Sequence, residues 1–143
     1  PGLLWFFGRR LHDVVPVRAR PRVRKAFVSG YLYGVDDSLL HLNGNCSCNY
    51  TPGIWRLLDM GDIASLVAPR PLLVQSCEKD HLNGARGFER DEQLDIVRDA
   101  YALLGKDENL LHEVCPGGHH LGVAHLAEDI EWLDSQVAEY AHA

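Results

Sequence analysis

Residues 68–80 read Ala-Pro-Arg-Pro-Leu-Leu-Val-Gln-Ser-Cys-Glu-Lys-Asp, and this stretch decides the fold class. Its two prolines must end any preceding helix, because proline cannot continue the helix ladder and disfavours helix in the residue before it. Leu72 to Ser76 then form a short apolar run that is typical of a buried strand. A polar turn follows and presents Asp80. The stretch therefore predicts a buried strand with a carboxylate just beyond its carboxyl end.

One further strand is expected on each side of this stretch, and two short helices are expected before it. The apolar runs from Lys25 to Leu32 and from Leu110 to Val114 predict the strands. A helix is expected from Ile54 to Met60. A second one is expected from Ile63 to Val67, with Asp62 as its N-cap.

The segment before the last strand predicts an amphipathic helix from Glu89 to Leu104. Its apolar residues recur three or four positions apart, and Gly105 stands where a left-handed C-cap belongs. A final helix is expected after the last strand, with one apolar face made of Leu126, Ile130, Leu133, Val137 and Tyr140. This alternation of strands and helices predicts an α/β fold, in which a parallel sheet is covered on both faces.

Composition and charge narrow the class of protein. The 143 residues are 46% hydrophobic and 24% charged, as in a soluble globular domain. No apolar run approaches the roughly 18 residues of a membrane helix, so no membrane partner is expected. Residues 1–25 carry seven Lys and Arg against Asp13 alone, whereas the whole chain has a net charge of −6. A basic arm can bind nucleic acid, but the acidic body argues against such a partner.

The four cysteines leave one alternative open. Cys46 and Cys48 stand too close together for the spaced disulfide framework of a small secreted domain, so a reduced, cytoplasmic protein is expected. A zinc site made of Cys46, Cys48, Cys115 and His119 is the alternative. It is weakened because C-x-C replaces the usual C-x-x-C spacing.

Titratable residues follow two of the expected strands. Functional groups of an open parallel sheet gather just past the carboxyl ends of the strands. Asp80 follows one strand, and His119 and His120 follow the next, after the sharp turn that Gly117-Gly118 allows. An aspartate and a histidine at adjacent strand ends can form two members of a nucleophilic triad. The histidine is then the base, and the aspartate orients its ring. His119 is the expected base, with His120 as the alternative. The structural alternative for Asp80 is that it only caps a turn.

Several segments together resemble a known family. They are Cys48-Asn49-Tyr50-Thr51-Pro52-Gly53, Asp62-Ile63-Ala64, Ala68-Pro69-Arg70-Pro71-Leu72-Leu73-Val74, Glu78-Lys79-Asp80 and Gly117-Gly118-His119. They resemble the C-terminal half of bacterial α/β-hydrolases of the acetyl xylan esterase and dienelactone hydrolase kind, over roughly residues 21–140. The resemblance implies a partial α/β-hydrolase fold with three C-terminal parallel strands and flanking helices. It also implies that Asp80 is the triad acid and His119 the base for a small ester substrate, with no metal or organic cofactor.

The nucleophile of that family has no counterpart in this sequence. It lies on a G-x-S-x-G turn between a strand and a helix, and no serine here has glycines at those positions. Gly44-Asn45-Cys46-Ser47-Cys48 lacks the second glycine. We therefore expect residues 21–143 to be the C-terminal part of a hydrolase domain that is inactive alone. Residues 1–20 are expected to be a basic segment, disordered or helical, of a fragment or of a frame-shifted gene.

A non-catalytic interaction module is the alternative function. A truncated hydrolase sheet would leave the strand from Lys25 to Leu32 with an open edge, and open strand edges pair with other chains. The alternative therefore predicts self-association through this edge.

Overall fold

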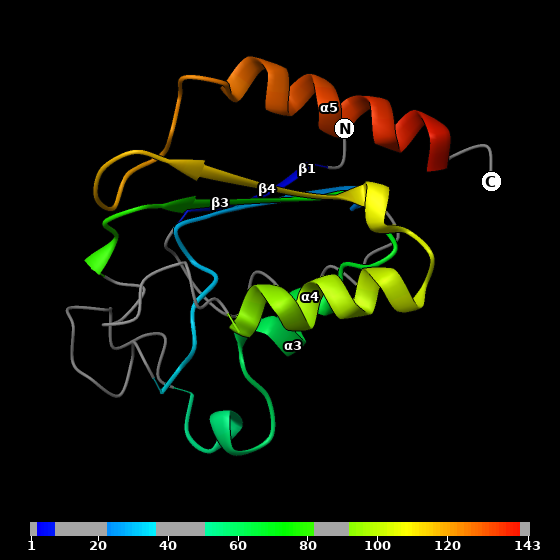
Figure 1. Cartoon of the computed structure of the whole chain (residues 1–143). Coiled ribbons are helices and arrows are strands. Elements are labelled where there is room, and N and C mark those ends of the chain that lie inside the picture. The colour runs from blue at the N-terminus through cyan, green and yellow to red at the C-terminus, as the bar shows by residue number, and fades with distance from the viewer. Residues whose placement is uncertain (1–2, 8–22, 37–50, 82–91, 141–143) are drawn as a thin grey trace.

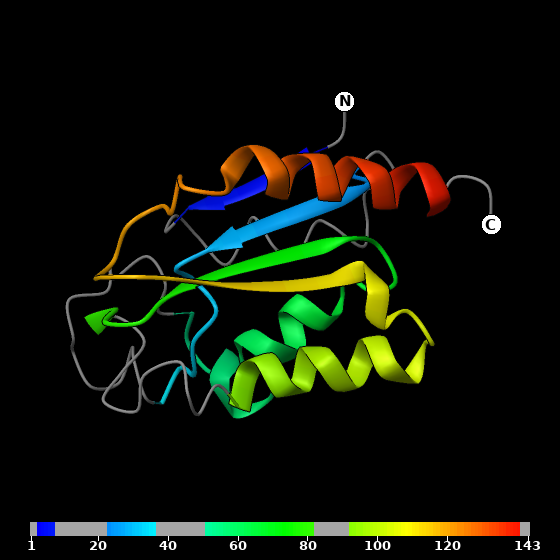
Figure 2. The same ribbon diagram turned by 45° about the horizontal axis from the view of Figure 1, so that its top comes forward.

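The computed structural model describes residues 3–7, 23–36, 51–81 and 92–140. In these residues one parallel sheet has its strands in chain order, which are β1 (Leu3–Phe7), β2 (Lys25–Ser29), β3 (Leu72–Cys77) and β4 (Leu110–Cys115). The helices are α3 (Met60–Ser65), α4 (Glu92–Leu103) and α5 (Leu126–Tyr140). Figure 1 shows α3 and α4 on one face of the sheet and α5 on the other, and Figure 2 shows the four strands side by side. The predicted α/β fold with a parallel sheet covered on both faces is confirmed.

The strand β1 corrects the expectation for the N-terminal segment. Leu3–Phe7 were expected to be disordered or helical, but they pair with β2 in parallel, from Leu3 opposite Lys25 to Phe7 opposite Ser29. A five-residue apolar run cannot be told from a buried helical segment by its pattern, and here the neighbouring strand decides. Because β2 also pairs with β3, it lies inside the sheet. The expected open edge at Lys25–Leu32 is therefore wrong.

The main apolar core lies between the sheet and the helices α3 and α4. Alternate strand residues point to this side, and the helices bury their apolar faces against them. The buried residues of this core are Ala26, Val28, Tyr31, Leu32, Tyr33, Val35, Met60, Ile63, Ala64, Val67, Leu72, Val74, Leu94, Val97 and Tyr101. The other alternate residues point toward α5, where Phe27 and Leu73 pack with Leu133 in a smaller cluster. The predicted apolar face of α5 is confirmed at Leu133, which is fully buried.

The helix α3 begins earlier than expected. Asp59, and not Asp62, is its N-cap, and its side chain accepts a hydrogen bond from the Met60 backbone N–H. Asp62 lies three residues inside and accepts from the Asp59 backbone N–H at 2.8 Å. This reciprocal capping box satisfies two backbone donors at once, so it favours the earlier start. Where a helix was expected from Ile54 to Met60, only the short 3-10 helix η3 (Ile54–Arg56) forms before α3.

The helix α4 ends as the sequence predicts. Gly105 has φ of 63°, and its N–H donates to Ala102 O while Lys106 N–H donates to Tyr101 O. A left-handed glycine closes the helix in this way because it satisfies carbonyls that lack helical partners. The predicted apolar face holds at Leu94, Val97 and Tyr101, but Leu104 is 52% exposed. Leu104 lies beyond the last helical residue, so it leaves the face that packs on the sheet.

In the described residues, none of the helices is both long and apolar enough to cross a bilayer.

Candidate active site

The loops after β3 and β4 leave the sheet side by side. The register pairs Cys77 with Cys115, the last residue of each strand. The acid loop (residues 78–81) and the histidine loop (residues 116–125) are then joined by backbone hydrogen bonds. Glu78 N–H donates to Cys115 O at 3.0 Å, and Lys79 N–H donates to Gly117 O at 2.8 Å. The two loops therefore start as a continuation of the sheet, which brings their side chains together.

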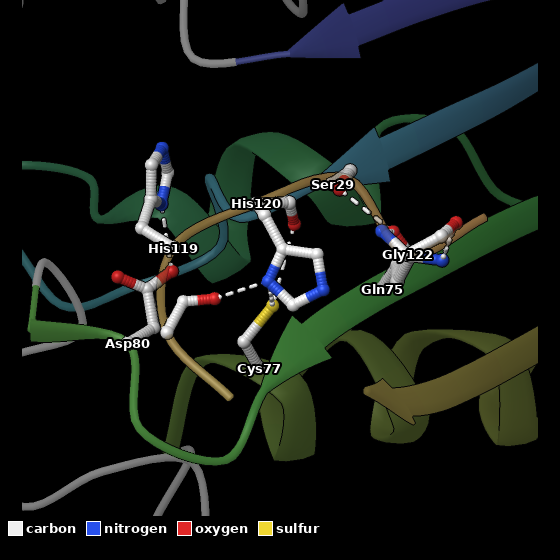
Figure 3. A network of polar contacts seen from close by, with 8 residues as sticks. Ser29, Gln75, Cys77, Asp80, His119, His120 and Gly122 are labelled. Carbon is white, nitrogen blue, oxygen red and sulfur yellow. Dashed lines mark hydrogen bonds and ion pairs between the residues drawn. The ribbon is translucent and has the colours of Figure 1, made fainter. Parts of the chain in front are cut away.

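Asp80 and His119 meet at this edge of the sheet. His119 Nδ1 lies 2.8 Å from Asp80 Oδ2, although the residues are 39 positions apart in the chain. The Asp80 side chain is fully buried, whereas that of His119 is 22% exposed. A proton on Nδ1 donated to the carboxylate leaves the lone pair on Nε2. In Figure 3 this second ring nitrogen points away from Asp80. The pair therefore has the geometry of a base held in one tautomer by a buried acid.

Gly30 is a part of this site that the sequence analysis missed. It directly follows β2, has φ of 60°, and its N–H donates to Gln75 O. A Cβ atom at this position would lie 2.9 Å from His119 Cε1 and 3.1 Å from His119 Nδ1. Only glycine therefore lets the imidazole lie this close to the backbone. A glycine directly after a buried strand is a signal that could have pointed to it.

His120 and His81 lie beside the pair without taking its place. His120 is exposed, and its Nδ1 lies 2.6 Å from Gly118 O and 3.7 Å from Cys77 Sγ. His81 is exposed and lies edge-to-face against His119, with ring centroids 6.4 Å apart. Of the two histidines proposed as the base, it is His119 whose ring contacts Asp80.

The described cysteines are buried and held as thiols. Burial raises the pKa of Cys77, whose Sγ donates to His120 O at 3.3 Å. Burial, together with the nearby Glu113 carboxylate, raises the pKa of Cys115 to about 11. A thiolate is the form that attacks carbon, so neither residue is activated as a nucleophile. Cys46 and Cys48, from the alternative zinc site, lie outside the described residues, and within those described no three His, Cys, Asp or Glu gather as metal ligands.

The fold has clear structural relatives. A glucuronoyl esterase of carbohydrate esterase family 15 from Caldicellulosiruptor kristjansonii superposes with a TM-score of 0.66 at 15% identity, over 88% of this chain and 40% of that one. The chain has part of the α/β-hydrolase fold. A methylesterase is similar with a TM-score of 0.56 at 18% identity, over 89% of this chain and 27% of that one. A Bacteroides fragilis protein assigned as an acetyl xylan esterase has a TM-score of 0.52 at 19% identity, over 72% of this chain and 26% of that one.

The likenesses cover only part of each of these structures. The chain spans 40% or less of the length of each of these three structures. No family profile and no curated protein sequence matches it.

Proposed function

We propose that this chain supplies the acid and the base of a carboxylic ester hydrolase. The observation that carries the proposal is the hydrogen bond between His119 Nδ1 and the buried carboxylate of Asp80, at the carboxyl ends of two adjacent parallel strands. A buried carboxylate in this position holds the imidazole in the tautomer that can accept a proton on Nε2. It also stabilises the imidazolium that forms when the proton arrives.

The proposed reaction is acyl transfer. A hydroxyl nucleophile attacks the ester carbonyl while His119 Nε2 takes its proton, and His119 then gives the proton to the leaving alcohol. Water repeats the sequence on the acyl intermediate and releases the acid. Asp80 orients His119 throughout and keeps its own charge. The structural relatives include esterases named for glucuronoyl, methyl and acetyl xylan esters, which supports an ester substrate.

The residues after β1 explain why we expect the chain to be inactive alone. β1 adjoins β2 in the sheet, and Phe7, its last residue, is level with Ser29. In an α/β-hydrolase the nucleophile follows a strand directly, in the spacing G-x-S-x-G. Counted from Gly8, this spacing puts Arg10 at the serine position and His12 at the second glycine. Residues 1–28 contain no serine, threonine or cysteine.

Restoring the missing motif tests this proposal. The variant Arg10→Ser/His12→Gly should be labelled at residue 10 by a fluorophosphonate, a reagent that modifies base-activated serines, as measured by mass spectrometry. Because general-base assistance contributes roughly a hundredfold, adding His119→Ala should slow the labelling by about that factor. The matched control Arg9→Ser/His12→Gly has its serine one position away and should stay unlabelled.

Two results would count against the proposal. Labelling that is equally fast with and without His119 would show that this histidine is not the base. Hydrolysis of p-nitrophenyl acetate by the wild-type chain that disappears in His119→Ala would contradict its inactivity.

A further inference from the structure

Gln75 is an unusual residue for its place in the fold. It lies in the middle of β3, among the apolar residues Leu73 and Val74, and it is only 1% exposed. A buried amide without partners destabilises a protein by roughly 1–3 kcal/mol, so such a residue needs hydrogen bonds on all its polar atoms. Its side chain shares a sheet face with Leu73, on the side of α5, because side chains alternate along a strand.

Every hydrogen-bonding position of the Gln75 amide has a partner. Oε1 accepts from Ser29 Oγ at 2.9 Å and from Gly122 N–H at 2.8 Å. Nε2 donates to Glu113 Oε2 at 2.7 Å and to Gly122 O at 3.0 Å. The amide therefore joins β2, β4 and the histidine loop to β3. Figure 3 shows Ser29 and Gly122 next to Gln75, which lies on the strand that leads to Asp80.

The contact between Gln75 and Gly122 has two hydrogen bonds, and it pairs the side-chain amide with the backbone of a loop residue. It resembles the exchange of bonds between two paired strand residues, although Gly122 belongs to no strand. Gly122 also lies very close to the sheet. A Cβ atom there would overlap Cys115 Sγ and would lie 2.9 Å from Gln75 Nε2. The loop is therefore seated directly on β3 and β4 at this residue.

His119 lies between this contact and a second attachment of the same loop. Gly117 O, two residues before His119, accepts from Lys79 N–H, and Gly122 is three residues after it. The first attachment holds the loop to the acid loop, and the second holds it to the strand that carries the acid loop. With both in place, the backbone around His119 is fixed relative to Asp80 on both sides.

We propose that Gln75 is a positioning residue that seats the histidine loop through Gly122 and so keeps His119 Nδ1 against Asp80. This inference rests on the proposed function, in which the pair acts as acid and base. None of the four hydrogen bonds of the Gln75 side-chain amide goes to Asp80 or His119, so this amide acts through the loop. Its loss therefore disturbs the His119–Asp80 hydrogen bond while leaving both of those residues unchanged.

The test is the proton NMR signal of the His119 Nδ1–H in the purified chain. An imidazole proton held by a carboxylate resonates far downfield of the amides, and Asp80→Asn and His119→Ala identify it by removing it. The variant Gln75→Met keeps the volume of the side chain but makes none of the four hydrogen bonds. Two lost loop bonds predict exchange of this proton with water that is faster by about tenfold or more.

Matched variants separate positioning from a general loss of stability. Ser29→Ala removes one hydrogen bond from the same amide but none from the loop, so the signal should keep its exchange rate. Gly122→Ala displaces the loop from the other side and should accelerate exchange as Gln75→Met does. This variant decides the matter if Gln75→Met does not fold.

Two outcomes would overturn the proposal in distinguishable ways. A signal that exchanges at the wild-type rate in Gln75→Met, or in Gly122→Ala, shows that the loop is seated without Gln75, while the proposed function stands. A wild-type chain with no such signal shows that the acid–base pair itself is not formed, and the proposed function fails with the inference.

Discussion

The two faces of β3 have different tasks. On the side of α3 and α4, Leu72 and Val74 belong to the main apolar core. On the side of α5, Leu73 is followed by Gln75, whose partners are polar and include Glu113 and the histidine loop. Apolar burial is non-directional and stabilises whatever shape it fills, whereas hydrogen bonds fix distances and angles. The face toward α3 and α4 therefore mainly supplies stability, whereas the face toward α5 fixes the position of the histidine loop.

Leu94→Ala should break the first face with the largest effect. Leu94 is 1% exposed in the core between α4 and the sheet, so its truncation should lower the free energy of unfolding by about 2–5 kcal/mol in urea titrations. The NMR signal of the His119–Asp80 bond should remain in the fraction that is folded. A lost signal in the folded variant would contradict the division between the faces.

Asp129→Asn should show that a buried carboxylate on the α5 side lowers the stability of the folded chain at neutral pH. Asp129 is 6% exposed, and burial together with the hydrogen bond and charge of Glu113 raises its pKa to about 6. Ionisation is thus harder in the folded state than in the unfolded one. The stability that the protonated carboxyl contributes is complete below about pH 4 and is lost as pH rises through 6.

Asparagine cannot ionise, so the Asp129→Asn variant should be more stable than the wild type above pH 6. The expected gain is about 1–3 kcal/mol in urea titrations at pH 7.5, and it should vanish at pH 4. Glu131→Gln, an exposed change on the same helix, is the control and should show no such pH dependence. An equal gain at both pH values would mean that ionisation is not its cause.

Gly30→Ala should affect geometry more than stability. Its positive φ predicts a loss of about 1–2 kcal/mol, and the new methyl group would displace the His119 ring. The His119 Nδ1–H signal should therefore disappear from a chain that still folds. Gly105→Ala is the matched control, since Gly105 has nearly the same φ but no atom within 4 Å of an added Cβ. It should show the same loss of stability and keep the signal.

Arg98→Ala should give the smallest effect. Its guanidinium pairs with Asp95 Oδ1 at 2.9 Å, but both side chains are more than half exposed. Such pairs contribute little, so the free energy of unfolding should change by less than about 0.5 kcal/mol and the His119 signal should not change. A larger loss would mean that the exposed side of α4, and not only its buried face, contributes substantially to the free energy of unfolding.

Local elements of the fold could be predicted because local physics decides them. β3 follows from an apolar run after Pro71, and the end of α4 follows from Gly105. The start of α3 was misplaced because two aspartates three residues apart can both cap a helix, and only the reciprocal bonds distinguish them. β1 was missed because a strand of five residues depends on its neighbour for its hydrogen bonds.

The residues of the candidate site likewise include some that the sequence could predict and some that it could not. Asp80 and His119 could be predicted because parallel strands bring their carboxyl ends to one edge, so the residues after them are expected to meet. Gly30 and Gln75 could not, since their roles depend on which atoms pack against them from segments distant in the chain. A glutamine inside a buried strand nevertheless indicates a hydrogen-bond network, because its buried amide needs partners.

The sequence alone predicted the class of fold and three of the strands, and it placed Asp80, and His119 with His120 as its alternative, just past the ends of two of them. It also shows that residues 1–28 contain no serine, threonine, tyrosine or cysteine. Only the tertiary structure decided that β1 covers the edge of β2, that His119 rather than His120 contacts Asp80, and that Gln75 holds the loop between them. The difference arises from the separation along the chain over which each interaction acts. Propensity and periodicity act over a few residues, whereas a hydrogen bond between positions 80 and 119 exists only once the strands beneath them have paired.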